Sequence, residues 1–539
     1  MLSASLKILK ALLTLSGVLF ILFIGVRAYL SQRGPALELW HKYAPKEMSA
    51  EEIDGADWEQ YLAAEENVFR AVRENVTDQL TTDERTSFNK YFENSPIYPG
   101  HFARNWNRSY VLEPNDAAHP AGAVVLLHGL TDSPYSLRHV ALRYQEHGFV
   151  VVAIRLPAHG TTPAALTKIH WPDWVAAARL AIREARRRSP APSPLHIVGF
   201  SNGGTIALKY ALEAIEDKSQ AQADRLILIS PMVGVTSLAR FAGLAGLPAI
   251  LPAFAKAAWL SVVPEFNPFK YNSFPVNGAR QSYLLTDSLR TLIASLSRRD
   301  RLAALPPILT FQSVVDFTVS TPAVLSGLYD FLPKNGSELV LFDLNRNAKF
   351  GPLFREAADT KLSRILPPAA RNYRLTIISN AGEGTDAAVE RVVESGATSE
   401  QTRPLTLEYP KGVFSLSHVA LPFPLDDSLY GLTPNDSEEF GVHLGNLALR
   451  GERGTLLVSL DSLSRMSSNP FFPYLAGKIE QYLPEQVSPV RADDSARSPA
   501  TSAPPVTPRS GANRVGQPDK ARDQKLKLYN SRKPGARIH

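Results

Sequence analysis

The most regular feature of the chain is a set of short runs in which consecutive positions are apolar and often β-branched. The runs are residues 123–129, 149–156, 195–201, 225–230 and 307–313. Strands that are apolar at consecutive positions belong to a sheet that is covered on both faces. Helix-like stretches, such as those from Asp173 and from Asn202, separate the first four runs. The alternation predicts an α/β fold with a mostly parallel sheet flanked by helices.

A longer apolar segment lies near the N-terminus, within residues 7–30. With its basic flanks it is long enough to span a bilayer. A cleaved signal peptide has the same charged start and apolar core, but no A-x-A-like site follows, because Arg27 interrupts the candidate position. We therefore expect residues 7–30 to be an uncleaved transmembrane anchor.

The charges beside this segment bear on its orientation. Lys7 and Lys10 precede it, whereas Arg27 and Arg33 follow it. The free amino terminus adds a positive charge on the first side, which favours a cytoplasmic N-terminus. The body of a single-pass membrane protein of this kind would be extracytoplasmic, in the periplasm.

Composition divides the rest of the chain into three parts. Residues 31–105 are mixed and helical, and we expect a helical stalk or packing arm. Residues 106–484 hold the strand and helix pattern. Residues 485–539 are basic and rich in proline, which predicts a disordered tail.

Charge and cysteine content exclude some classes of function. The chain has 58 Lys and Arg against 52 Asp and Glu, but eleven of the former and five of the latter lie in the tail, so the body is neutral. By composition, the body is not a nucleic-acid-binding surface. The absence of cysteine excludes disulfides, thiolate nucleophiles and Cys-based zinc sites.

The sequence "GFSNG", residues 199–203, lies where a predicted buried strand meets a predicted helix. So tight a turn requires strained backbone at Ser201 and close approach of strand and helix, and Gly199 and Gly203 remove the side chains that would collide. This is the G-x-S-x-G nucleophile elbow. A glycine-rich turn with an incidental serine is the alternative, which the strand–turn–helix setting disfavours.

A nucleophilic serine needs donors for the oxyanion. One is expected to be the backbone N–H of Asn202, and the second that of Leu130, after Gly129 in the loop "LLHGLTDSP". His128 lies in the same loop but precedes Ser201 in the chain, so we assign it a role in shaping the loop rather than that of the base.

The order Ser, then Asp or Glu, then His selects the other catalytic candidates. His418 lies in a loop-like stretch between apolar runs, and we favour it as the base over His443, which fits a packing role. Asp316 follows a predicted buried strand, at the end where sites of parallel sheets gather, and we favour it as the acid over Asp343.

Five motifs together carry a family resemblance: "LLHGLTDSPYSLR", "IRLPAHGTTP", "IVGFSNGG", "QSVVDFTVS" and "SLSHV" occur in this order. The set resembles the serine-hydrolase branch of the α/β-hydrolase superfamily, which includes bacterial carboxylesterases and monoacylglycerol lipases. The resemblance covers about residues 109–316 and, locally, His418. It implies an α/β-hydrolase fold and assigns the same roles to the residues named above.

Two segments are placed with the help of this resemblance. Residues 236–301 are apolar with helical spacing and stand where the family has a cap over the active site; ordinary core helices are the alternative. Residues 344–417 are a departure, because the family usually has a short loop between the last strand and the histidine. The insertion contains a further strand-like run.

The sequence thus predicts a membrane-anchored serine hydrolase that cleaves a small-molecule or lipid carboxylic ester through an acyl-enzyme intermediate. We expect no cofactor, no metal and no nucleic-acid partner. An amidase, a thioesterase or an acyltransferase could use the same residues, and a non-catalytic scaffold of the same fold is the second alternative.

Overall fold

The computed structural model describes residues 2–234, 246–316, 318–347, 361–366, 369–410, 413, 415–435, 437–445 and 467–484. The predicted tail, residues 485–539, and residues 236–245 of the predicted cap lie outside the described residues.

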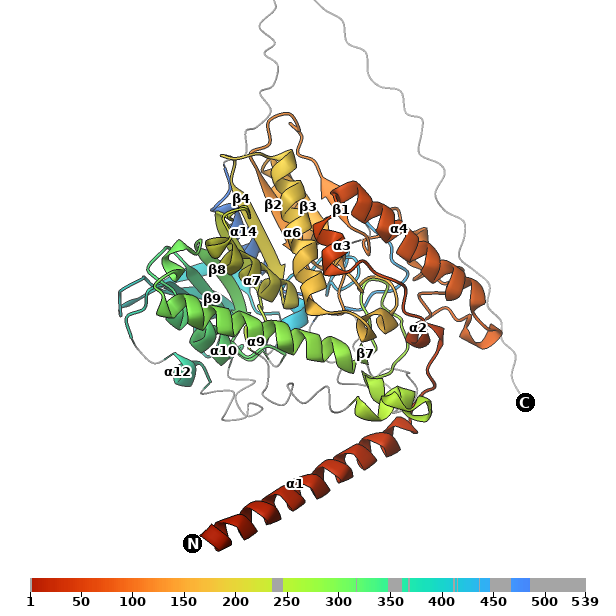
Figure 1. The fold of residues 1–539 in the computed structure, drawn as a ribbon. Helices are drawn as coiled ribbons and strands as arrows, with labels where there is room; N and C mark the ends of the chain where they lie inside the picture. The colour runs from red at the N-terminus through yellow and green to blue at the C-terminus, as the bar shows by residue number, and fades with distance from the viewer. Residues whose placement is uncertain are drawn as a thin grey trace, which may run out of the picture. The chain divides into compact units, whose positions relative to one another are not determined.

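The centre of the molecule is a ten-stranded sheet with the strand order β1-β3-β2-β4-β5-β8-β9-β10-β11-β12 (Figure 1). The strands are β1 (Tyr110–Leu112), β2 (Gly122–Leu127), β3 (Phe149–Ile154), β4 (Leu195–Phe200), β5 (Arg225–Ile229), β8 (Ile308–Ser313), β9 (Glu338–Phe342), β10 (Arg374–Asn380), β11 (Ala387–Val393) and β12 (Glu400–Glu408). Neighbours from β3 to β10 pair in parallel, whereas β1, β11 and β12 are antiparallel to their partners. The predicted α/β-hydrolase fold is confirmed.

Helices cover both faces of the sheet because its central strands bury both sets of alternating side chains. Val125 and Leu127 of β2 join the core beneath one layer of helices, and Val124 and Leu126 join the core on the opposite face. The first layer contains α6 (Trp171–Arg188), α7 (Asn202–Glu216) and α9 (Val276–Arg298), and the second contains α5 (Arg138–Glu146) and α14 (Phe472–Glu480). Shorter elements connect them: η4 (Pro134–Leu137), η5 (Pro163–Thr167), η9 (Leu302–Ala304), α10 (Thr321–Gly327), η10 (Tyr329–Phe331) and η12 (His418–Ala420).

The register of the parallel strands brings their carboxyl ends to one edge. Leu127 at the end of β2 pairs with Gly199, Phe200 at the end of β4 pairs with Ile229, and β8 ends beside β9 with Ser313 opposite Phe342. The loops that follow these strands therefore share that edge, where sites of parallel sheets form.

The N-terminal region consists of α1 (Leu2–Ser31) and an arm that packs on the body. The arm contains α2 (Leu39–Lys42), α3 (Ala50–Asp54), α4 (Trp58–Asn75), η1 (Thr77–Gln79), η2 (Thr82–Glu84) and η3 (Pro99–His101). The buried guanidinium of Arg155, just after β3, donates to both carboxylate oxygens of Glu47 at 2.9 Å and to Glu65 at 3.1 Å. These bonds attach residues of the arm to the sheet.

The expected cap, residues 236–301, and the expected insertion, residues 344–417, differ from each other in structure. Residues 246–301 contain η7 (Leu247–Ile250), η8 (Pro252–Ala258), a two-stranded sheet of β6 (Trp259–Ser261) and β7 (Phe274–Pro275), and α9. Since α9 packs on α6 and α7, it is a layer helix. Residues 344–417 contain α12 (Lys361–Ile365) and β10, β11 and β12, which extend the sheet at its edge.

Candidate active site

Ser201 lies between the end of β4 and the start of α7, with φ 54° and ψ −116°. This left-handed φ is strained for a residue with a side chain and is typical of a nucleophile elbow. A Cβ atom at Gly199 would lie 2.5 Å from the carbonyl oxygen of Gly203, and a Cβ atom at Gly203 would collide with the carbonyl oxygen of Leu127. Both glycines are therefore required by the close approach of the strand, the helix and the neighbouring strand.

His418 contacts both of the other catalytic candidates. Its Nε2 atom lies 3.0 Å from Oγ of Ser201, and its Nδ1 atom lies 2.9 Å from Oδ2 of Asp316. The imidazole stacks on Phe200 with 5.3 Å between ring centroids. The structure thus brings together the serine, histidine and aspartate that the sequence selected, and all three side chains are buried.

Asp316 is surrounded by donors. Its Oδ1 atom accepts from the backbone N–H groups of Thr318 and Val319, both at 2.8 Å, and Gln312 donates to Oδ2 at 3.1 Å. Burial alone would raise the pKa of Asp316, but His418 and the backbone donors outweigh it, so the pKa lies below its usual value. The carboxylate is therefore charged at neutral pH and can hold the imidazole in one orientation.

The rival residues have other partners. Nδ1 of His443 lies 3.0 Å from the carbonyl oxygen of Ser428, and the carboxylate of Asp343 accepts from Nε of Arg346 at 2.7 Å. Neither residue is hydrogen-bonded to Ser201.

The two expected oxyanion donors follow neighbouring strands, with Leu130 in the loop after β2 and Asn202 at the start of α7, after β4. Among the described residues, neither the N–H of Leu130 nor that of Asn202 has a hydrogen-bond acceptor. His128 accepts the N–H of Leu156 at its Nε2, at 3.0 Å, and its Nδ1 lies 2.9 Å from the carbonyl oxygen of Gly129. Burial lowers the pKa of His128 well below its usual value, so the ring is neutral. Its hydrogen bonds connect the loop after β2 to the loop after β3.

Sequence reasoning missed one charged residue at this site, Asp132. A Cβ atom at Gly129 would lie 3.2 Å from Cβ of Ser201 and 3.3 Å from Oδ2 of Asp132, so both side chains border Gly129. Its cationic partner is Lys270, with Nζ at 3.9 Å. Burial raises the pKa of Asp132 above its usual value, although the charges of Lys270 and His418 act against this. The motif contained this residue, but nothing in the sequence indicated that its side chain turns inward.

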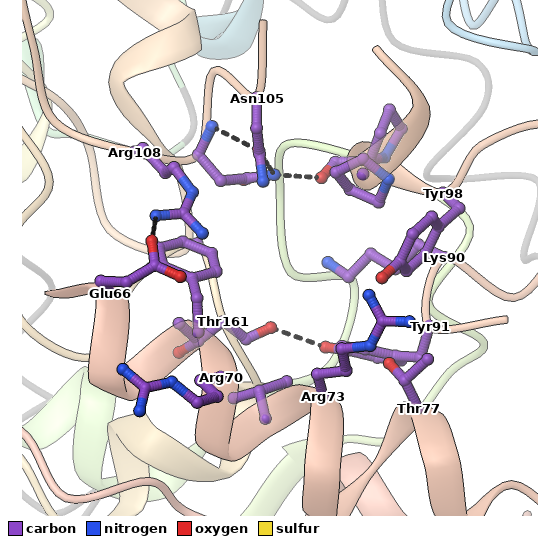
Figure 2. A pocket seen from close by; sticks show the side chains of 17 residues that line it. Glu66, Arg70, Arg73, Thr77, Lys90, Tyr91, Tyr98, Asn105, Arg108 and Thr161 are labelled. Atoms are coloured by element: carbon purple, nitrogen blue, oxygen red, sulfur yellow. Dashed lines mark hydrogen bonds and ion pairs between the residues drawn. The ribbon is translucent and has the colours of Figure 1, made fainter. Parts of the chain in front are cut away.

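A separate hollow of about 290 Å³ lies between α4 and the loops near residues 100 and 160 (Figure 2). Its lining includes several basic side chains, and some of them pair with acidic side chains. Arg108 pairs with Glu66 at 2.5 Å, and Arg73 pairs with Glu93 at 3.0 Å. The hollow contains none of the catalytic candidates. Across the residues that the structure describes, no group of three or more His, Cys, Asp and Glu is placed to hold a metal ion.

Comparison with known proteins points to hydrolases. Residues 118–306 match the family model Hydrolase_4, described as serine aminopeptidase, S33. A thermostable monoacylglycerol lipase of Bacillus sp. (strain H-257) is 32% identical over 99 residues, which are 18% of this chain and only 38% of that relative.

Solved structures are similar over a comparable region. A structure from work on the metagenome-derived lipolytic enzymes LipS and LipT is 21% identical, covers 44% of this chain and 88% of its own, and has a TM-score of 0.35. A soluble variant of monoglyceride lipase from Saccharomyces cerevisiae, in complex with a substrate analog, is 15% identical, covers 43% and 81%, and has a TM-score of 0.33.

Proposed function

The chain is an α/β-hydrolase that is similar to bacterial carboxylesterases and monoacylglycerol lipases, and we propose that it is a membrane-anchored serine hydrolase of carboxylic esters. The observation that carries the proposal is the pair of hydrogen-bond contacts from Ser201 through His418 to Asp316, at 3.0 and 2.9 Å. Three side chains so connected have the arrangement of a Ser-His-Asp triad for nucleophilic acyl transfer.

In the first half-reaction, Oγ of Ser201 attacks the ester carbonyl carbon while Nε2 of His418 takes the hydroxyl proton. The carbonyl oxygen becomes an oxyanion, which accepts hydrogen bonds from the amides of Leu130 and Asn202. Asn202 is also the first residue of α7, and the helix dipole favours negative charge beside its amide. Nδ1–H of His418 donates to Asp316, which stabilises the imidazolium.

The tetrahedral intermediate then collapses. The bond from the carbonyl carbon to the alkoxy oxygen breaks, and the alcohol leaves with the proton from Nε2 of His418. A water molecule, deprotonated by the same nitrogen, attacks the acyl-serine, and the carboxylic acid and free Ser201 are released. The chain's own residues provide every proton transfer in this sequence.

The ester is the proposed substrate bond, and a lipid ester is the proposed class. The lipase among the relatives supports this choice, whereas the family model's description names a peptidase. Cleavage of an amide or a thioester, or transfer of the acyl group to another acceptor, would use the same residues.

Helix α1 is the proposed anchor. Its segment Leu6–Ser31 has 26 residues and is apolar enough to cross a membrane, and none of its most apolar window is buried in the protein. A helix of that length spans about 39 Å, more than the hydrocarbon core requires. We place the body in the periplasm on the charge argument given above; a signal sequence would share the length and the composition.

The proposal is tested on the full-length protein in detergent micelles or nanodiscs. A fluorophosphonate probe should label wild type, and matched p-nitrophenyl esters, p-nitroanilides and thioesters of graded acyl length should show ester cleavage as the fastest reaction. Probe labelling with a faster anilide reaction would make the protein an amidase. Absence of both labelling and turnover in folded protein would favour the scaffold.

A further inference from the structure

The end of α1 is joined to the cap segment Leu247–Ser261. We propose that the apolar side chains exposed beside this junction rest in the surface of the lipid bilayer, so that the enzyme takes a lipid ester from the membrane that holds α1. The substrate part of this inference rests on the proposed ester hydrolysis, and the docking part rests only on the proposed anchoring by α1.

Hydrogen bonds in both directions hold the junction together. The guanidinium of Arg27 donates to the carbonyl oxygens of Ala257 at 3.2 Å and Trp259 at 3.1 Å. Gln32 donates to the carbonyl oxygen of Ala253 at 2.7 Å. In return, Nζ of Lys256 lies within 3.4 Å of the carbonyl oxygens of residues 33–35. These contacts place η8 at the point where α1 leaves the predicted membrane span (Figure 1).

The apolar side chains next to the junction are turned to the outside. Ile250 is 78% exposed and Leu251 58% exposed, and Leu247 and Leu260 are also exposed. Exposing large apolar side chains to water costs free energy in proportion to their exposed area. A cluster of such side chains on the surface therefore marks a binding surface. The cluster on the cap segment lies next to the exposed apolar side chains of α1. The proposed partner of the cluster is therefore the same lipid bilayer that surrounds α1.

The polar groups at the junction also fit a membrane–water boundary. Tyr29 is 57% exposed, and the guanidinium of Arg33 lies over its ring at 4.5 Å from the centroid. Tyrosine and arginine at the end of a spanning helix mark the headgroup level. The exposed cap side chains lie in the same layer, where apolar residues of an interfacial segment enter the boundary of the acyl chains.

A short piece of chain connects this surface to the active site. Strand β6 follows η8 and pairs with β7, and the loop between them holds Lys270 and Tyr271. The N–H of Tyr271 donates to the carbonyl oxygen of Thr131 at 2.8 Å, and Lys270 faces Asp132, both in the oxyanion loop. Residues 247–271 therefore contact the proposed membrane surface at their start and the oxyanion loop at their end. This arrangement suits a substrate that enters from the bilayer.

The docking is tested by fluorescence, for which the natural absence of cysteine is an advantage. Full-length Ile250→Cys and Leu142→Cys variants are labelled with an environment-sensitive fluorophore and reconstituted in phosphatidylcholine nanodiscs. Leu142 on α5 is the matched control, since it is an exposed leucine of the same domain, at 41%. Lipids with brominated acyl chains should quench the label at position 250 by twofold or more and leave that at 142 unchanged. Equal quenching at both positions, or none at 250, overturns the proposal.

The use of membrane substrate is tested by activity. An Ile250→Ser/Leu251→Ser variant should hydrolyse monooleoylglycerol in nanodiscs about tenfold more slowly than wild type but p-nitrophenyl butyrate within twofold, and Leu142→Ser should change neither rate. Unchanged monooleoylglycerol hydrolysis, or equal loss of both activities, overturns this part. If wild type cleaves neither ester, the proposed function fails while the quenching result still decides the docking.

Discussion

The Nε2 atom of His418 lies 3.0 Å from the Oγ atom of Ser201, although 217 positions separate the two residues in the chain. The intervening chain includes the cap segment, α9 and the outer strands of the sheet. Oγ of Ser313, the last residue of β8, donates to the carbonyl oxygen of Leu416 at 3.0 Å, two residues before the histidine. This bond attaches the loop that holds His418 to the sheet edge, at a point in the chain that follows the inserted strands.

Replacement of Ser201 by alanine removes the proposed nucleophile. We expect Ser201→Ala to lose about 10³-fold or more of the esterase activity and all fluorophosphonate labelling, with an unchanged thermal transition. Ser230→Ala is a close control, because Ser230 is buried at the end of β5 and also has a positive φ, 44°. It should keep activity within threefold. A folded Ser201→Ala protein with substantial activity would contradict the assignment.

The two candidate bases are separated by paired variants. His418→Ala should abolish turnover and probe labelling, because the hydroxyl of Ser201 then has no proton acceptor. His443→Ala should leave both within about threefold, since that ring contacts the carbonyl oxygen of Ser428. Kinetics and labelling of the two proteins decide between them, and the reverse pattern would transfer the role to His443.

Asp132 should influence the acid limb of the pH–activity profile. Its carboxylate and the imidazole of His418 interact electrostatically, so removal of the carboxylate changes the electric field at the imidazole. In Asp132→Asn this negative charge is lost, and the acid limb of kcat/KM should move to lower pH by up to about one unit.

The matched control for this shift is Asp343→Asn, which neutralises a buried aspartate that pairs with Arg346 instead. Its acid limb should stay at the wild-type pH. Superimposable profiles for wild type and Asp132→Asn would show that the carboxylate has no electrostatic effect on the base.

Buried histidines should make the fold sensitive to acid. Burial, with the nearby charge of Arg225, lowers the pKa of His196 from about 6.5 to about 3. Between these values the unfolded chain binds a proton that the native protein does not, so stability falls as the pH drops below about 6.5, by up to about 1.4 kcal/mol per pH unit for this residue. Denaturant unfolding from pH 7 to pH 4.5 should give a shallower pH slope for His196→Gln than for wild type. The exposed His119→Gln variant should keep the wild-type slope.

Topology is tested by fusion and truncation. Alkaline phosphatase fused after Pro484 should be active if the body lies in the periplasm, and a well-expressed but inactive fusion would place the body in the cytoplasm. Removal of residues 2–24 should release active protein from the membrane, because it leaves Arg27 and its bonds to the cap in place. Retention of this truncated protein in the membrane fraction would show that another part of the chain also binds lipid.

The central strands could be predicted from the sequence because each is short, rich in β-branched residues and apolar at consecutive positions, a pattern typical of a doubly covered sheet. The proximity of Ser201, Asp316 and His418 could also be predicted, since the first two follow parallel strands and chain order limits the third. These inferences need only local patterns and the rule that parallel strands end at one edge.

Other features depend on contacts between distant residues. The charges of Arg155, Glu47 and Glu65 are unremarkable in the sequence, yet their pairing attaches the arm to the sheet. The insertion was expected as a departure with a further strand-like run, and its place in the fold depends on a distant contact, because that run pairs with β9 and continues the sheet. The apolar spacing before Trp259 predicts regular helices, whereas prolines at the start of η7 and η8 accompany short 3-10 turns.

The outermost strand, β12, has consequences for the behaviour of the enzyme in concentrated solution. Its exposed residues include Glu400, Arg403 and Pro404, and Glu400 is paired with Arg391 of β11. Charges and proline on an edge strand discourage pairing with another molecule. Behind this hairpin lies β10, whose residues 375–378 are Leu, Thr, Ile and Ile. The insertion that separates Asp316 from His418 therefore also protects the apolar sheet from self-association, and a protein shortened by removal of β11 and β12 should aggregate.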